Sequence, residues 1–282
     1  SHVYYLDLKH YETLNQIWPE YFKSSTPPAR ATIQVAAMPT DTPFEINAIA
    51  VRDRSQIRRI NLPGAQSPVP LSPAVQTSDR LWISGILGRN ASTGEIPATP
   101  TAQVEMAFDR LRRVLGAASL DFRHLISLNI YVTSAMPEET VSRLLAQYIP
   151  DRQNVAISTT PVPALPFGTA IGIHGVATRH LRPRTRDGNC VASDGTIYCG
   201  QYTADDYRSA LVGLPAILQR MNGGALPQIA ASYVMMGDLK EFTTMNGVYA
   251  EVMPSPFPTR TTVQPMPVGR APKFRWSVIA ER

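Results

Sequence analysis

Apolar side chains recur every three or four positions in the stretch TAQVEMAFDRLRRVLGAA, residues 101–118. The stripe on one side of the helical wheel consists of Val104, Phe108, Leu111 and Leu115. This pattern predicts an amphipathic helix that packs its apolar stripe against another layer of the fold.

The rest of the chain continues to alternate between helical and extended patterns. Further helices are expected over residues 137–149, 205–224 and 241–253. Strands are expected over residues 78–85, 124–133, 195–201 and 229–236. Strands that are connected by helices of the same kind in each repeat favour an α+β fold. In such a fold the helices cover one face of a mixed sheet.

One strand comes unusually early in the chain, within STPPARATIQVAAMP, residues 25–39. Its alternation places Arg30, Thr32 and Gln34 on one face, and the apolar positions between them on the other. A guanidinium at the start of such a strand suits a planar carboxylate ligand, because its two prongs match the two oxygens. From spacing alone, an ordinary ion pair between Arg30 and the nearby Glu45 is an open alternative.

The chain contains a threefold internal repeat. Residues of the first unit recur 127 positions later in the second, and those of the second recur 103 or 104 positions later in the third. The predicted units are residues 1–54, which hold only the second half of the repeat, 55–178 and 179–282. The corresponding positions are Asn15, Ser142 and Asn246, then Arg30, Ile157 and Arg260, then Glu45, Gly172 and Arg275.

Composition limits the classes of function. A net charge of +5 without a run of five basic residues makes a nucleic-acid partner unlikely, and no apolar stretch is long enough to cross a membrane. The five histidines show no metal-ligand spacing, and no usual cofactor motif is present. Counting outward from an Asp194-Gly195 turn places Cys190 opposite Cys199. A disulfide fits that position, but without a visible signal peptide we favour reduced thiols and a cytoplasmic protein.

Residues 10–51, HYETLNQIWPEYFKSSTPPARATIQVAAMPTDTPFEINAIAV, resemble the C-terminal half of reactive intermediate deaminases of the Rid (RidA/YjgF) family. The shared motif is N-x-x-W, then PAR, P and E-I-x-A-I-A. Residues 72–98, SPAVQTSDRLWISGILGRNASTGEIPA, resemble that family's N-terminal half. The resemblance covers nearly the whole chain.

The resemblance implies a chorismate-mutase-like fold in each unit and a pseudo-trimeric barrel of three sheets with the helices outside. It implies hydrolysis of 2-imino or 2-enamino acids to keto acids and ammonia, without a cofactor, in clefts between neighbouring units. The candidate catalytic residues are Arg30, Glu45 and Thr32. The candidate substrate-binding residues are Asn15, Arg260, Asn246, Cys199 and Ser84, with Cys199 and Ser84 at the family's Ser-Gly position.

The units are expected to be unequally equipped. The first keeps Asn15, Arg30 and Glu45, so we predict the main site there. The second has lost both the arginine and the glutamate, and the third has Arg275 in place of the acid. Two interpretations remain: an imine or enamine hydrolase, in archetypal or diverged form, or a non-catalytic protein that binds a small carboxylate.

The first unit lacks the hairpin and first helix that precede the arginine strand in the other units. Half a sheet would leave a strand edge and an apolar face bare, so we predict a companion polypeptide that carries the missing half. Ser1 is then a candidate self-cleavage nucleophile. The alternatives are a cloning scar, a protease nick or an incomplete expressed fragment.

Overall fold

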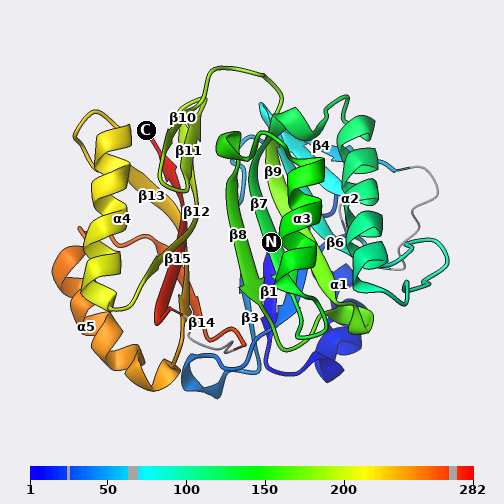
Figure 1. Cartoon of the computed structure of the whole chain (residues 1–282), viewed down its shortest axis with the longest axis horizontal. Helices are drawn as coiled ribbons and strands as arrows, with labels where there is room; N and C mark the ends of the chain where they lie inside the picture. The colour runs from blue at the N-terminus through cyan, green and yellow to red at the C-terminus, as the bar shows by residue number, and fades with distance from the viewer. Residues whose placement is uncertain (24–25, 63–68, 267–271) are drawn as a thin grey trace.

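The computed structural model describes residues 1–23, 26–62, 69–266 and 272–282 of the chain. Its strands form three mixed sheets, and its helices pack on their outer faces (Figure 1). The predicted α+β class is confirmed. No helix among the described residues is both long and apolar enough to span a lipid bilayer.

The second sheet has six strands in the order β4-β5-β6-β9-β7-β8. Their bounds are β4 Ile57–Ile60, β5 Ala74–Thr77, β6 Arg80–Leu87, β7 Leu125–Val132, β8 Ala156–Pro161 and β9 Ile171–Thr178. Helices α2 (Pro100–Ala117) and α3 (Glu138–Tyr148) cover it, and the predicted stripe of α2 is completely buried. Thr99 caps α2 by accepting a hydrogen bond from the Ala102 amide.

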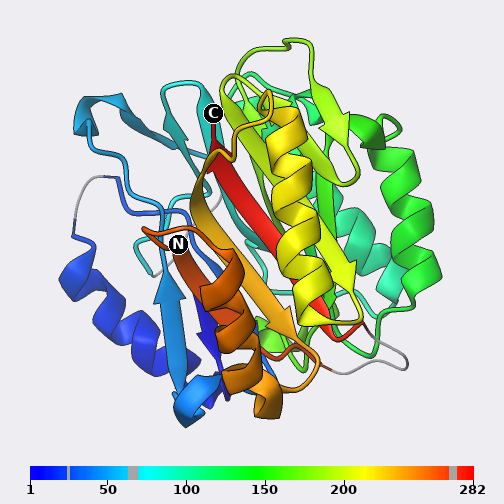
Figure 2. The same ribbon diagram turned by 90° about the vertical axis from the view of Figure 1, so that its left-hand side faces the viewer.

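The third sheet repeats this topology in the order β10-β11-β12-β15-β13-β14. Its strands are β10 Thr185–Asp187, β11 Cys190–Ser193, β12 Thr196–Ala204, β13 Gln228–Met236, β14 Thr259–Val263 and β15 Phe274–Glu281. Helices α4 (Tyr207–Met221) and α5 (Phe242–Val252) cover it, as seen face-on in Figure 2.

The first sheet has three strands in the order β2-β1-β3, and one helix, α1 (Tyr11–Tyr21). Strand β1 (His2–Tyr5) pairs parallel with β2 (Ala31–Gln34) and antiparallel with β3 (Phe44–Asn47). These are the counterparts of β7, β8 and β9, because His2 lies opposite Ala31 and Asn47 as Asn129 lies opposite Ser158 and His174. The first unit therefore holds half a sheet, while its companion polypeptide stays a prediction.

Neighbouring sheets meet where the arginine strand of one unit faces the hairpin of the next. The Gly85 amide in β6 donates to the Arg30 carbonyl at 3.0 Å. At the next junction, the Asn189 side chain donates to the Ile157 carbonyl at 2.6 Å and accepts from its amide. The named strands pair within their own sheets, an isolated antiparallel bridge joins Ala37 to Gln264, and the predicted pseudo-trimeric barrel is not confirmed.

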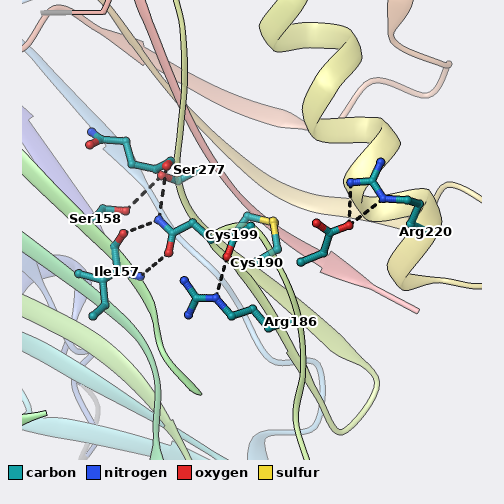
Figure 3. The surroundings of a disulfide bond; sticks show 11 residues. Ile157, Ser158, Arg186, Cys190, Cys199, Arg220 and Ser277 are labelled. Carbon is teal, nitrogen blue, oxygen red and sulfur yellow. Dashed lines mark hydrogen bonds and ion pairs between the residues drawn. A yellow bond between two sulfur atoms is a disulfide. The ribbon is translucent and has the colours of Figure 1, made fainter. Parts of the chain in front are cut away.

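The hairpin of β11 and β12 is correctly predicted, but the expected reduced thiols are wrong. Asp194 and Gly195 form its turn with positive φ, and Cys190 lies opposite Cys199 with 3.9 Å between their Cα atoms. At that separation the two sulfurs are joined in a disulfide, next to Ile157 and Ser277 (Figure 3). Direct cross-strand neighbours bring the thiols together whatever the compartment.

Candidate functional site

Arg30 is the centre of a buried cage on the helix side of the first sheet. Its Nη2 donates to Asn15 Oδ1 at 2.6 Å, and its guanidinium carbon lies 4.6 Å from the Trp18 ring centre and 5.7 Å from that of Tyr11. Burial lowers the pKa of Arg30, and Nη1 has no hydrogen-bond partner among the described residues. Such an unpaired buried donor is suited to an anionic ligand.

Arg260 stands in a cage of the same design in the third unit. Its Nη2 donates to Asn246 Oδ1 at 2.5 Å, and its guanidinium lies 4.4 Å from the Tyr249 ring centre and 5.9 Å from that of Phe242. Burial lowers the pKa of Arg260 as well. Two of the three units therefore keep a complete arginine cage.

The second unit has lost the cage as a set. The four positions hold Glu138, Ser142, Leu145 and Ile157. Ser142 and Leu145 replace the asparagine and the nearer ring, and Ile157 packs against the core of its own unit. Since arginine, amide and rings disappear together, the cage acts as one device for holding the guanidinium.

The aromatic members of the cages were not predicted as site residues, although Trp18 ends the N-x-x-W motif. In α1, Tyr11 lies four positions before Asn15, and Trp18 three positions after it, with Phe242 and Tyr249 placed alike in α5. Side chains at these spacings share one helix face. An aromatic-x3-Asn-x2-aromatic pattern was therefore the available signal.

The pocket beside Arg30 is formed jointly by the first and second units. The Ser84 hydroxyl accepts from the Arg30 amide at 3.0 Å and donates to the Ser72 carbonyl at 2.6 Å. A small cavity of about 70 Å³ opens next to Arg30 and Thr32, and Gly85 and Gly172 of the second unit line its other side. Thr32 thus lies beside Arg30 as predicted, and the site straddles two units.

The predicted pairing of Arg30 with Glu45 in one pocket is wrong. Strand β1 separates β2 from β3, so the two residues are not on neighbouring strands. Glu45 lies opposite Tyr4 and shares its face, whereas Arg30 lies on the other face with Asn15. The position beside Arg30 that corresponds to Glu45 is Gly172, which carries no acid.

Glu45 instead faces the third unit. The neighbouring Asn47 donates to Thr261 Oγ1 at 2.7 Å, and Thr261 is the residue after Arg260. Burial raises the pKa of Glu45, and the Thr261 side chain opposes that rise. The acid of the first unit therefore lies at the junction with the third unit.

The expected place of Cys199 is off by one residue. Cys199 lies opposite Val278 as Ile83 lies opposite Gly175, so the counterpart of Ser84 is Gly200. A Cβ at Gly200 would come within 2.5 Å of the Ile157 carbonyl oxygen, which excludes a serine there. Cys199 is also bonded to Cys190 and offers no thiol to a substrate.

Ser1 lies beside β2, where its hydroxyl donates to the Ala29 carbonyl at 3.2 Å. Its role as a self-cleavage nucleophile stays a prediction. No group of three or more histidine, cysteine, aspartate or glutamate side chains in the described part of the chain could hold a metal ion.

The fold and the cages define an α+β protein built from a repeated unit, in which two of the three units hold a caged arginine. The Endoribonuclease L-PSP family matches residues 1–52 and 64–179, more than half of the chain. The chain therefore belongs to the Endoribonuclease L-PSP (RidA/YjgF) family, as predicted.

Three individual similarities each cover 44% of the chain. A RutC family protein of Aquifex aeolicus is 30% identical over 125 residues, 44% of this chain and 100% of its own length. The human 2-iminobutanoate/2-iminopropanoate deaminase is 30% identical over 129 residues, 44% of this chain and 91% of its own. The crystal structure of the YjgF gene product of E. coli is 24% identical and covers 44% of this chain and 99% of its own, with a TM-score of 0.40.

Proposed function

We propose that this protein hydrolyses small carboxylate-bearing imines or enamines, and that its equipped site lies between the third and first units. The observation that carries the proposal is the hydrogen bond from Asn47, two residues after Glu45, to Thr261, the residue after Arg260. Arg30 and Gly172 line one cavity across the first junction. Arg260 corresponds to Arg30, and Glu45 corresponds to Gly172. By analogy, Arg260 and Glu45 would line one cavity at the junction of the third unit with the first.

The groups at this junction suit imine hydrolysis. Arg260, held by Asn246, binds the substrate carboxylate with two parallel hydrogen bonds. Glu45 accepts a proton from a water that attacks the carbon of the protonated imine, which forms a carbon–oxygen bond and moves the C=N electron pair to nitrogen. Glu45 returns this proton to the nitrogen and then accepts the hydroxyl proton, while the carbon–nitrogen bond breaks, ammonia leaves and the oxygen closes the keto group. A positioned carboxylate contributes about 10²–10⁴-fold to such a proton transfer.

The names of relatives agree with this chemistry. The human and mouse relatives are named 2-iminobutanoate/2-iminopropanoate deaminase, with 30% and 27% identity to this chain. A cytoplasmic location, like the exact substrate, stays a prediction.

A companion polypeptide with a hairpin and a helix would close this junction. The support is an apolar face: Phe44 and Ile46 are 45% and 42% exposed, although their counterparts are buried in both other units. Native mass spectrometry of the protein from its own source tests it. A bound partner is expected, and a folded 31.0 kDa species alone would contradict it.

The test of the function is ammonia release from a freshly generated 2-imino acid. Wild-type protein is expected to accelerate release over buffer, while Glu45→Gln abolishes turnover and retains binding of the corresponding keto acid. A protein that binds the keto acid without accelerating ammonia release would be a binding protein and not a hydrolase. Full turnover in Glu45→Gln would remove the proton acceptor from the mechanism.

A further inference from the structure

A second and larger cavity than the one beside Arg30 lies where the three units face one another. Its volume is about 390 Å³, which is within the range of small-molecule sites. Its lining includes corresponding positions of all three units. One set is His2, Asn129 and Tyr233, and another is Asn47, His174 and Ser277. We call it the axial cavity.

The fusion of three repeats makes the axial cavity asymmetric. Three identical subunits would place the same side chain three times at each corresponding position. Here the first set of positions holds an imidazole, an amide and a phenol, and the second set holds an amide, an imidazole and a hydroxyl. Such a mixed set can present donors, acceptors and ring faces to a single molecule.

The aromatic groups of the cavity lie in contact and are uncharged. The ring centres of His2 and His174 are 4.3 Å apart, and those of His2 and Tyr233 are 5.4 Å apart. His174 Nε2 is 3.1 Å from the Tyr131 hydroxyl. Burial lowers the pKa of His174 to about 3 and that of His2 well below its usual value, so both imidazoles are neutral near pH 7.

Two polar groups in the lining are free to bind a ligand. Among the described residues, neither the Asn129 amide nor the Tyr233 hydroxyl has a hydrogen-bond partner. The described lining contains no aspartate or glutamate that could pair with a cation, and its charged side chain is Arg54. An anion would lose its hydration beside two uncharged imidazoles, which is costly.

We propose that the axial cavity binds an uncharged planar nitrogen heterocycle. Ring faces of His2 and Tyr233 stack on it, and Asn129 and the Tyr233 hydroxyl bond its ring nitrogens. His174 and Tyr131 also line the cavity beside Arg30, so a bound heterocycle would contact the wall between the two spaces. This site is independent of imine hydrolysis, since it uses neither arginine cage nor Glu45.

Calorimetric titration with three flat probes tests the proposal: adenine, which is uncharged at neutral pH, benzoate and benzamidine. One adenine per chain is expected to bind with a Kd below about 1 mM, and each charged probe at least about tenfold more weakly. Preference for either charged probe, or no heat with adenine, would overturn the proposal.

Paired variants locate the binding. Tyr233→Phe keeps the ring and removes one hydroxyl, so adenine is expected to bind about fivefold to tenfold more weakly. Asn129→Leu gives a second loss of similar size, and Tyr202→Phe outside the cavity is the matched control. Thermal unfolding checks that each variant is folded. Unchanged adenine affinity in both cavity variants, or equal loss in Tyr202→Phe, would contradict this site.

Discussion

Strand β3 of the first sheet and strand β9 of the second sheet are corresponding strands of the repeat, yet they have opposite environments. Phe44 and Ile46 of β3 are 45% and 42% exposed, whereas Ile171 and Ile173, at the corresponding positions of β9, are 0% and 1% exposed. Strand β9 is paired on both sides and covered by α2, while β3 is the edge of a three-stranded sheet. The apolar pattern of a strand therefore specifies a face, and the neighbouring elements decide whether that face is buried.

The same comparison holds for chemistry. The two arginine cages are alike within their units, but each faces a different neighbour. Arg30 faces the second unit, which offers Gly172, whereas Thr261, the residue after Arg260, bonds Asn47 of the first unit. The chemistry available to each repeated unit therefore depends on the unit it faces, because each site combines residues of two units.

The largest expected difference is in stability. Ile173→Ala removes a buried side chain and leaves a cavity, and we expect it to lower the free energy of unfolding by about 2–5 kcal/mol. Ile46→Ala, at the matching position of the first unit, should change it by about 0.5 kcal/mol or less. Urea unfolding followed by circular dichroism measures both. Equal losses would show that the β3 face is covered in the protein studied.

The β11–β12 hairpin of the third unit differs from the β5–β6 hairpin of the second unit by its disulfide. Cys190 and Cys199 correspond to Ala74 and Ile83. Replacing both cysteines by serine is expected to cost about 2–3 kcal/mol, because a short closed loop is released in the unfolded chain. Thermal unfolding with and without reductant provides the measurement. The doubly substituted protein should be insensitive to reductant, and an equal effect of reductant on it would rule out the bond as the cause.

The pH dependence separates the two junctions. Since burial raises the pKa of Glu45, a mechanism that needs its carboxylate loses kcat/KM as pH falls through a midpoint above the usual value of about 4.3. Below that midpoint the rate should fall about tenfold per pH unit. Arg30→Ala should retain this acidic limb, because no acid lies opposite Arg30. An acidic limb at the usual glutamate pKa would indicate an exposed carboxylate.

The sequence was sufficient for many of the helices and strands and for the repeat. The helical stripe of α2, the Asp194-Gly195 turn and the corresponding asparagine and arginine positions are all where the patterns placed them. These features depend on short-range periodicity and on spacing within one unit. Strand order is a long-range property, so the insertion of β1 between β2 and β3 was not predictable from local pattern.

That insertion is the reason why Arg30 and Glu45 were wrongly expected to share one pocket. Residues fifteen apart, such as Arg30 and Glu45, looked like partners along the chain but lie on opposite faces of one sheet. The Ser84 counterpart was misplaced by one residue because it was assigned from the glycine that follows it, whereas the pairing counted from the two hairpin turns aligns Cys199 with Ile83. To predict which side chains meet across a junction, the strand register is required, and the spacing along the sequence is not sufficient.

The most direct test is the rate of ammonia release from a 2-imino acid by Arg260→Ala and Arg30→Ala, measured side by side with wild-type protein. Both substitutions remove the same group from the same kind of cage, so each is the control for the other. We predict that Arg260→Ala lowers kcat/KM by about 10²-fold or more, since two charge-assisted hydrogen bonds of about 1.5–3 kcal/mol each are lost. Arg30→Ala should stay within about threefold of wild type. A large loss in Arg30→Ala with an active Arg260→Ala would contradict the account and return the site to the first junction.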